Sequence, residues 1–382
     1  MALDIAQIES LVRSAAASLQ RGDAAQARQS LEQVTATGRG NIQIWLLLAL
    51  ACKGTNDVAA EERAVDSALK IDSANIRALI LKGDCCAAGK DPRGATSFYE
   101  RAIGLAQGKQ LPADLAREVE RAEALSKAAS AEYRTYLEEW IGRGPAIGGQ
   151  RFRTALDIMF GDKQIYLQQP TIFYFPGLPQ IQFYEREQFD WIAEVEAATD
   201  AMREELSELL ATEEGFRPYL TTSADRPRTE FHGLNDNPEW STMHLFENGG
   251  PVNVNVARAP RTYETLIKAP LCHITTRAPT IMFSLLRAGA RIPAHTGQIN
   301  TRLICHLPLI VPEGCAFRVG NEVREWEVGK TMIFDDTIEH EAWNEGPDDR
   351  VVVIFDIWRP ELTLDERQAV VTMFEGIDRY GV

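Results

Sequence analysis

The 382-residue sequence predicts a multidomain protein in which N-terminal α-helical repeats precede a double-stranded β-helix, or jelly-roll, domain. Its length favours two or three domains, because single hydrophobic cores seldom grow beyond ~250–300 residues. Residues 1–142 keep apolar side chains at helical spacing and contain almost no proline. Residues 143–382 instead contain short β-like runs separated by Gly and Pro.

The first region is expected to be an array of helix pairs. Shifting the sequence by 34 residues aligns apolar and small positions over three units, and this period resembles the tetratricopeptide repeat. Glu61 stands where a small residue is expected, so an irregular helical bundle stays as an alternative. The aligned sets are Leu11/Trp45/Leu79, Ala15/Ala49/Gly83, Ser18/Cys52/Cys86, Ala27/Glu61/Ala95, Leu31/Val65/Tyr99 and Val34/Ala68/Ala102.

The turns and the end of the array follow from composition. Gly22-Asp23 and the segment from Gly54 to Asn56 are expected to form turns between helices. A last helix over residues 113–140 is expected to cap the array, and the glycines and proline of 142–145 mark the domain boundary. Such repeats predict a protein or peptide partner, or docking onto the following domain.

Composition limits the classes of function. Hydrophobic residues make up 45% and charged residues 25%, as in ordinary globular proteins. The net charge of −15 argues against a nucleic-acid or membrane-surface partner. An acid at Asp4 and the lack of an apolar run near ~20 residues predict a cytoplasmic protein. Six cysteines without a CxxC motif predict reduced, mostly buried thiols.

The second region is expected to be built from short strands around one helical segment. Runs rich in β-branched and aromatic residues predict strands at 166–175, 282–286, 302–311, 316–319, 331–334 and 351–357. Residues 191–210 keep helical spacing and are expected to pack outside the sheets. Many short strands with Gly and Pro turns favour a double-sheet jelly roll over an α/β fold.

A metal site using imidazole must draw on the six histidines, which are His232, His244, His273, His295, His306 and His340. Two of them are the candidates. His295 stands at the start of an expected strand in the segment 293–297, and His340 follows another strand. Strand ends on opposite sides of a barrel can converge, but two distant histidines are more often hydrogen-bonded structural residues, so both interpretations stay open.

Arg350 is the residue just before an apolar run that predicts a strand, so its positive charge needs a partner or exposure to water. If it faces the barrel interior, it requires an anionic partner, such as a bound carboxylate ligand. Alternatively, it occupies an exposed first position of the strand and pairs with Asp348 or Asp349.

Residues 284–362 strongly resemble the aspartyl/asparaginyl β-hydroxylase family, and a weaker likeness covers most of 165–365. Members of this family are iron(II)- and 2-oxoglutarate-dependent oxygenases, and helical repeats before the domain are similar to the family's layout. The motifs that carry the likeness are His295-Thr-Gly-Gln-Ile-Asn-Thr-Arg302, Cys305-His-Leu307, Ile333-Phe-Asp-Asp336, Glu339-His-Glu341 and Asp356-Ile-Trp-Arg-Pro-Glu-Leu362.

The resemblance implies an iron site with two protein ligands, His295 and His340. Gly297 stands where most related oxygenases have a metal-binding carboxylate, and the family shares this absence. Two neutral imidazoles leave four positions on octahedral Fe(II) for 2-oxoglutarate, water and O2. The charges of Fe(II) and the dianionic cosubstrate sum to zero, and two protein ligands alone should hold iron loosely.

The resemblance also implies roles for four further residues. Arg350 and Ser284 match the groups that hold the distal carboxylate of 2-oxoglutarate, and His306 matches a residue near its metal-side carboxylate. Arg302 matches a residue of the substrate pocket. Ile304 departs from the family, which usually has an arginine there, so recognition of an acidic substrate side chain is open.

The function implied is a dioxygenase that hydroxylates an aspartyl, asparaginyl or other amino-acid-type substrate and releases succinate and CO2. The substrate is a free amino acid, a peptide or a protein. Two alternatives are kept: a 2-oxoglutarate-dependent halogenase, in which chloride takes the position vacated at Gly297, and a non-catalytic scaffold in which the repeats do the binding.

Overall fold

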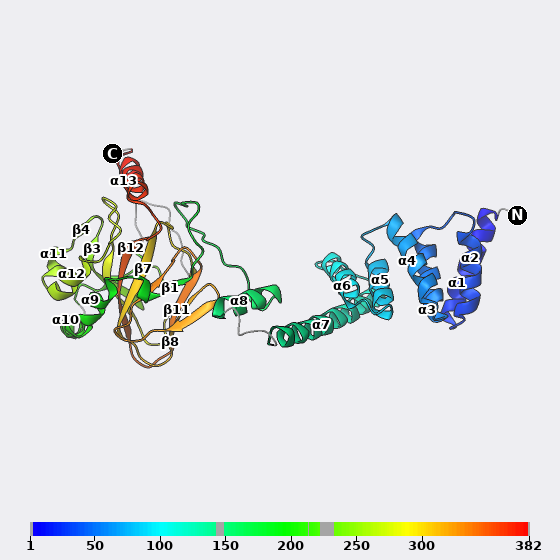
Figure 1. The fold of residues 1–382 in the computed structure, drawn as a ribbon, viewed down its shortest axis with the longest axis horizontal. Coiled ribbons are helices and arrows are strands. Elements are labelled where there is room, and N and C mark those ends of the chain that lie inside the picture. Colours follow the sequence, from blue (N-terminus) through cyan, green and yellow to red (C-terminus); the bar gives the residue numbers. More distant parts are fainter. Residues whose placement is uncertain (1–2, 143–148, 213, 222–232, 381–382) are drawn as a thin grey trace. The chain divides into compact units, whose positions relative to one another are not determined.

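The computed structural model divides into two compact units, Met1–Phe160 and Gly161–Val382 (Figure 1). It describes residues 3–142, 149–212, 214–221 and 233–380. The boundary that the sequence predicts after residue 142 adjoins residues 143–148, which lie outside the described residues. Across the described ranges, no helix combines the length and apolar character needed to cross a membrane.

The first unit consists of helices that pack in sequence order. From α1 to α7 each helix contacts the next, and α1 also contacts α3, α3 contacts α5, and α5 contacts α7. Helix pairs therefore stack on one another, as predicted for the repeats, and the unit is not an irregular bundle. The helices are α1 (Ile5–Gln20), α2 (Ala24–Thr35), α3 (Ile42–Gly54), α4 (Val58–Ile71), α5 (Ile76–Ala88), α6 (Pro92–Ala106), α7 (Ala113–Gly142) and α8 (Gly149–Met159).

The helix starts repeat with the same period as the apolar positions. Asp23, Asp57 and Asp91 are N-caps of α2, α4 and α6, and each carboxylate accepts a backbone N–H of the first turn. Each cap follows a residue with positive φ, namely Gly22, Asn56 and Lys90 at 84°, 54° and 61°. Gly54, which the sequence analysis assigned to a turn, instead lies in the last turn of α3.

Small residues are needed where the helices of a pair approach closely. A Cβ on Gly83 would overlap the ring of Tyr99 on the neighbouring helix, and a Cβ on Gly54 would lie 2.6 Å from Cβ of Ala24. Glu61 is nevertheless accommodated in the core, with 5% of its surface exposed. Burial raises the pKa of its carboxyl group.

The second unit contains two antiparallel sheets, with strand orders β1-β10-β7-β12-β5-β3-β2 and β6-β11-β8-β9. Between β5 and β12 the chain crosses from one sheet to the other at nearly every step, which is the predicted double-sheet jelly roll. The strands are β1 (Phe183–Tyr184), β2 (Arg217–Pro218), β3 (Trp240–Glu247), β4 (Gly250–Pro251), β5 (Ile281–Leu286), β6 (Arg291–His295), β7 (Arg302–Ile310), β8 (Cys315–Val319), β9 (Glu322–Glu325), β10 (Met332–Phe334), β11 (His340–Asn344) and β12 (Arg350–Trp358).

The helices between residues 192 and 266 cover the outer face of the larger sheet, whereas the last helix packs against a separate apolar cluster that includes Leu178 and Trp358 (Figure 1). Ile192, Met202 and Leu206 join the apolar cluster formed by the outer face of that sheet, so the helical prediction for 191–210 is confirmed. The helices are α9 (Ile192–Ala197), α10 (Thr199–Thr212), α11 (Asn253–Val256), α12 (Pro260–Leu266) and α13 (Leu364–Arg379), with a short 3-10 helix at Arg186–Gln188.

The two-residue period of the strands decides which side chains enter the space between the sheets. On β7, the odd-numbered residues 303–309 join the cluster beneath the helices, whereas Arg302, Ile304 and His306 line an internal cavity. On β12, the odd-numbered residues 351–357 join the same cluster, and Arg350 lines the cavity. The larger sheet thus supplies an apolar outer layer and a polar inner row.

The strand prediction for residues 166–175 is wrong. These residues form no strand, and Phe173 makes only an isolated parallel bridge with Ile299. Instead, the segment follows the loops at one end of the smaller sheet and bonds to their backbone. The other five predicted strands correspond to β5, β7, β8, β10 and β12, while β1 to β4, β9 and β11 were not predicted. The expectation that a strand starts at His295 is wrong, because β6 ends at this residue.

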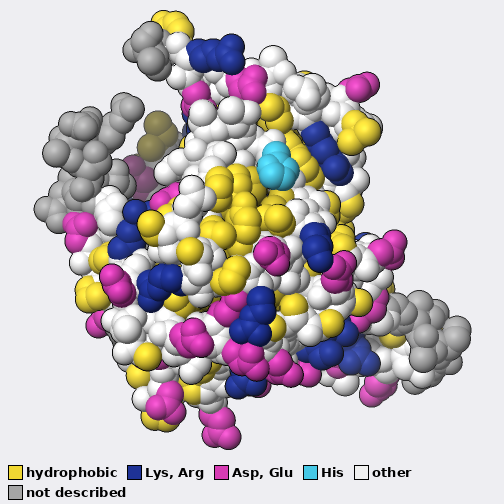
Figure 2. Space-filling model, turned by 90° about the vertical axis from the view of Figure 1, so that its left-hand side faces the viewer, with side chains coloured by type: hydrophobic (Ala, Val, Ile, Leu, Met, Phe, Trp, Pro, Cys, Tyr) yellow, Lys and Arg dark blue, Asp and Glu magenta, His cyan; other side chains and the backbone are white. Residues whose placement is uncertain are grey.

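One face of the molecule carries a mixed surface. Figure 2 shows hydrophobic side chains gathered near its centre, with Lys and Arg interspersed among Asp and Glu around them. This face therefore presents no large field of one sign, although the chain as a whole has a net charge of −15.

Candidate active site

The two candidate metal ligands lie directly opposite each other on neighbouring strands. His295 ends β6 and His340 begins β11, and the two residues are paired in the antiparallel register. Paired residues project their side chains to the same face, so the imidazole centroids lie only 4.1 Å apart. The ladder therefore brings together two residues that are 340 − 295 = 45 positions apart in sequence.

Both imidazoles are oriented by backbone carbonyls. Nδ1 of His295 lies 2.8 Å from the carbonyl oxygen of Pro293, and Nδ1 of His340 lies 3.0 Å from that of Ile338. A ring that donates from Nδ1 has its lone pair on Nε2, the form in which histidine binds a metal. Burial lowers the pKa of His295, and burial together with His295 lowers the pKa of His340 to about 3, so both rings are neutral at pH 7.

Arg350 lies on the inner face of β12, with 1% of its surface exposed. Its guanidinium carbon stands 4.7 Å from the ring centroid of Trp326, and its Nε has no hydrogen-bond partner among the described residues. Asp349, the partner considered from sequence, binds Arg287 instead. Burial lowers the pKa of Arg350 to about 10, so the group is still charged at pH 7. The structure thus favours the interior position over the exposed one.

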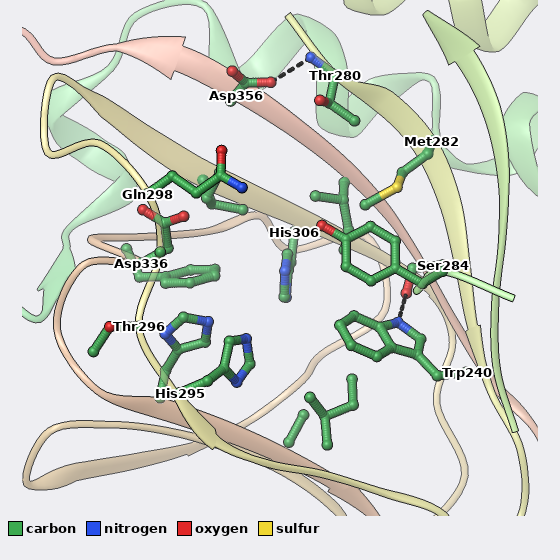
Figure 3. Close-up of a pocket in the computed structure, with 18 of the residues that line it drawn as sticks. Trp240, Thr280, Met282, Ser284, His295, Thr296, Gln298, His306, Asp336 and Asp356 are labelled. Carbon is green, nitrogen blue, oxygen red and sulfur yellow. Dashed lines mark hydrogen bonds between the residues drawn. The ribbon is translucent and has the colours of Figure 1, made fainter. Parts of the chain in front are cut away.

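Ser284 and His306 line the same cavity from β5 and β7, the two strands that flank β12. The indole Nε1 of Trp240 donates to Oγ of Ser284 at 3.2 Å, which fixes the direction of the hydroxyl group (Figure 3). His306 packs against Phe317 and Phe334, and its Nδ1 is buried without a partner among the described residues. Burial lowers the pKa of His306 well below its usual value, and Arg350 lowers it further.

The cavity between the sheets has a volume of about 650 Å3 and contains every site residue that the sequence predicted. Figure 3 shows His295, His306 and Trp240 directed into it from different strands. The other histidines lie elsewhere: His273 is exposed, His244 lies beside Glu247 on β3, and His232 is outside the described residues. Among the described residues, no group of three or more His, Cys, Asp or Glu side chains is arranged to hold a metal.

Residues 196–360 match the family model described as Aspartyl/Asparaginyl beta-hydroxylase. These residues belong to the aspartyl/asparaginyl β-hydroxylase family. The chain is 35% identical over 180 residues to the ornithine lipid ester-linked acyl 2-hydroxylase of Rhizobium tropici, a match covering 46% of this chain and 60% of that protein. It is 39% identical over 145 residues to human aspartyl/asparaginyl beta-hydroxylase, covering 37% and 19%.

The first unit has only weak likeness to solved structures. PcrH from Pseudomonas aeruginosa is 17% identical and overlaps 34% of this chain and 95% of that chain, at a TM-score of 0.31. The repeat architecture of the first unit therefore rests on its own helix packing and on the periodic caps described above.

Asp336 is a residue of the β-hydroxylase domain that the sequence analysis did not assign. A Cβ on Gly297 would overlap the carboxylate of Asp336, so this carboxylate fills the space that a side chain at Gly297 would take. Its Oδ1 is buried without a partner among the described residues. Burial raises the pKa of Asp336 to about 7, an effect that Arg302 opposes. The sequence did contain a signal for this role of Asp336: Gly297 has no side chain, and two acids, Asp335 and Asp336, stand shortly before His340.

Arg302 lies at the rim of the same cavity and already has acidic partners. Its Nη1 donates to Oδ2 of Asp356 at 3.1 Å, and its Nη2 lies 3.7 Å from Oδ2 of Asp336. Burial acts against the charge, but Asp356 and Asp336 raise the pKa of Arg302. Ile304 lines the cavity on the same strand. The charge of Arg302 is therefore matched within the protein.

Proposed function

We propose that the second unit is an Fe(II)- and 2-oxoglutarate-dependent hydroxylase acting on an amino-acid-type substrate that is free, peptidyl or part of a protein. One observation carries the proposal: a pair of neutral, buried imidazoles shares a cavity with a fully buried arginine that has no carboxylate partner among the described residues. An unpaired buried charge is costly, so the arginine implies an anionic ligand in that cavity.

The residues present fit an iron site. His295 and His340 would hold the metal through Nε2, because their Nδ1 atoms face backbone carbonyls. The buried, unpartnered Oδ1 of Asp336 fits a hydrogen bond from a water in that region, since a carboxylate here replaces the missing side chain of Gly297. When bound, iron and 2-oxoglutarate supply the oxidising chemistry, in which O2 and 2-oxoglutarate give succinate, CO2 and one hydroxyl group on the substrate.

Arg350 and Ser284 would bind the distal carboxylate of 2-oxoglutarate. Arg350 provides a rigid guanidinium fork in a dry environment, where a bidentate contact with a carboxylate is strongest. Trp240 orients the Ser284 hydroxyl by occupying its acceptor side, which leaves the O–H to donate to the carboxylate. His306 would lie near the metal-side carboxylate, with its neutral ring supported by Phe317 and Phe334.

The position of Asp336 supports hydroxylation over halogenation. A chloride ion at the place left by Gly297 would need the space that the carboxyl group of Asp336 already fills. Mass spectrometry of the product formed in chloride buffer tests this point. A chlorinated product would overturn the hydroxylase proposal in favour of the halogenase.

Arg302 would contact the substrate at the mouth of the cavity. Because Asp356 already accepts from Arg302, an acidic substrate side chain would have to compete with that carboxylate. The apolar side chain of Ile304 offers no cation for it either. These features support a substrate that presents a neutral group, such as an amide or a hydroxyl, to this wall.

The helical repeats would bind a protein partner or the protein that carries the substrate. Asp84 of α5 accepts from Lys53 of α3, Tyr99 of α6 and Arg121 of α7, so one buried acid fixes the relative positions of four helices. Comparing the rate of substrate-dependent succinate release by the full chain with that of a chain lacking residues 1–142 tests this role. Equal rates on a protein substrate would count against it.

The central test is metal binding and succinate release. His295→Ala and His340→Ala should each abolish iron binding in the presence of 2-oxoglutarate, together with the succinate formed without substrate. His273→Ala is the matched control, because that histidine is exposed and remote from the cavity. Normal 2-oxoglutarate turnover in either cavity variant would rule out the metal assignment, and a wild-type protein that binds no iron would favour the non-catalytic scaffold.

A further inference from the structure

A strap of chain, residues 168–180, crosses the loops at one end of the smaller sheet. It lies before the residues that match the family model, which begin at 196. Its backbone bonds to both loops that adjoin the imidazole pair: Gln169 N–H donates to the carbonyl of Thr337 at 2.7 Å, and Thr171 N–H to that of Gly297 at 3.0 Å. The strap therefore joins the loop after His295 to the loop before His340.

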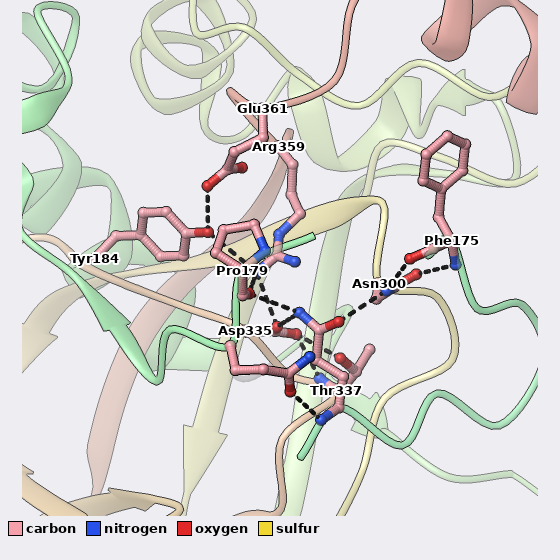
Figure 4. Close-up of polar contacts among 10 residues, drawn as sticks. Phe175, Pro179, Tyr184, Asn300, Asp335, Thr337, Arg359 and Glu361 are labelled. Carbon is pink, nitrogen blue, oxygen red and sulfur yellow. Dashed lines mark hydrogen bonds and ion pairs between the residues drawn. The ribbon is translucent and has the colours of Figure 1, made fainter. Parts of the chain in front are cut away.

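One side chain of the strap links these loops directly (Figure 4). Nε2 of Gln168 donates to Oδ2 of Asp335 at 2.6 Å and to the carbonyl of Pro179 at 3.0 Å. Its Oε1 accepts from Nδ2 of Asn300 at 2.9 Å. Gln168 is buried, and both the donor and the acceptor of its amide form hydrogen bonds within the protein interior.

The two residues that Gln168 connects are themselves fixed. Asp335 forms an ion pair of 2.9 Å with Arg359, in which neither side chain is exposed, and its Oδ1 accepts from the backbone and hydroxyl of Thr337. Asn300 binds the backbone of Phe175 through both ends of its amide. The network thus extends from the strap through both loops to the end of β12.

The strand ladder alone does not hold these loops. His295 is the last residue of β6 and His340 the first of β11, and the pairing shifts register between His340 and Ala342. Beyond the pair, the two chains continue as irregular segments, joined to each other by the bond from Gly297 N–H to the carbonyl of Asp336 at 2.6 Å. Asp336, which fills the space beside Gly297, belongs to the loop that Asp335 anchors.

We propose that Gln168 is a positioning residue of the metal site, whose amide holds the loops that flank His295 and His340 at a fixed separation. The inference rests on the proposed function, because it assigns a support to the iron site described there. Partners of this kind orient metal ligands without touching the metal, and their loss typically weakens metal binding by about 10–100-fold.

Titration of the full chain with Co(II) in the presence of 2-oxoglutarate tests the proposal. Gln168→Leu should weaken Co(II) binding by about 10-fold or more and change the ligand-field spectrum of the bound metal. The KM for 2-oxoglutarate in turnover without substrate should stay close to that of wild type, because Arg350 and Ser284 lie on the larger sheet. Gln182→Leu is the matched control: the side chain of Gln182 accepts from Asn321 N–H at 3.2 Å, and the substitution leaves in place the bond from Asp335 N–H to the Gln182 backbone carbonyl at 3.3 Å.

A second variant keeps the proposal falsifiable if Gln168→Leu does not fold. Gln168→Glu keeps the side-chain length and the acceptor for Asn300 but places a carboxylate against Oδ2 of Asp335, so it should also weaken Co(II) binding. Wild-type affinity in both Gln168 variants, or an equal loss in Gln182→Leu, would overturn the inference alone. Failure of the wild-type protein to bind Co(II) would overturn the proposed function as well.

Discussion

Replacing Arg350 by Met should have opposite effects on binding and on stability. Without a ligand, Arg350 is a buried cation whose charge is met by no described carboxylate. Replacing such a group by an apolar side chain of similar length removes its desolvation penalty, so the free energy of unfolding should stay the same or rise by up to ~1–4 kcal/mol. A structural arginine with a paired acid would instead lower it.

The loss of 2-oxoglutarate binding should be large. Removing one partner of a dry, bidentate contact between a guanidinium and a carboxylate costs ~2–4 kcal/mol. At ~1.4 kcal/mol per tenfold change, the dissociation constant should increase by about 30–700-fold. Metal affinity measured without the cosubstrate should change much less, because Arg350 lies on β12 and the imidazole pair on the smaller sheet.

Two measurements on the same samples check this prediction. Calorimetric titration with 2-oxoglutarate in the presence of Mn(II) gives the binding constant, and urea denaturation without ligands gives the stability. Arg291→Met is the control. Arg291 is exposed, and its guanidinium carbon lies 5.2 Å from the ring centroid of Trp343, so this variant loses a similar ring contact outside the cavity. An unchanged binding constant combined with a less stable protein would refute the assignment of Arg350.

Three further predictions follow from close contacts. Gly297→Asp would place a carboxylate where most related oxygenases have one, but its Cβ would overlap Asp336, so metal titration should show tighter binding only when Asp336→Ala is added; equal affinities of the single and double variants would contradict this. Gly83→Ala should destabilise the first unit by ~1–3 kcal/mol in urea denaturation, whereas Gly104→Ala, with open space around it, should not; similar values for both would argue against the packing account. Arg302→Met should raise the KM for the substrate in a succinate assay while leaving substrate-free turnover intact, and loss of both activities would place Arg302 in a different role.

The central strands of the larger sheet were predictable because they are buried on both faces. β5, β7 and β12 are rich in β-branched and apolar residues, which identify a strand from composition alone. The smaller sheet was largely missed, since β6 and β11 contain histidine, proline and charged residues in place of an apolar alternation. The error at 166–175 has the opposite cause: strand-like residues there bond to loops through tertiary contacts that no local pattern specifies.

The site shows the same division between local and long-range information. The histidines, Arg350 and Ser284 could be named from sequence because a family resemblance carries them as motifs. The proximity of Asp336 to Gly297 depends on how two loops meet, and the amide of Gln168 joins residues 132 and 167 positions away. Their roles became visible only when these distances were known.

Because His295 and His340 are paired directly, the distance between their imidazoles does not depend on how many residues lie between them in the chain. The β6–β11 ladder pairs them directly, while β7 to β10 and their connecting segments form the intervening residues 296–339. Residues inserted in the turn around Gly314 would therefore lengthen the chain between the two histidines without changing their pairing. Deleting one residue within β11 would rotate the strand by one pleat and turn the following side chains to the opposite face. The architecture thus tolerates grafting in its turns but not a change of register within this ladder, which is a practical guide for redesigning substrate preference.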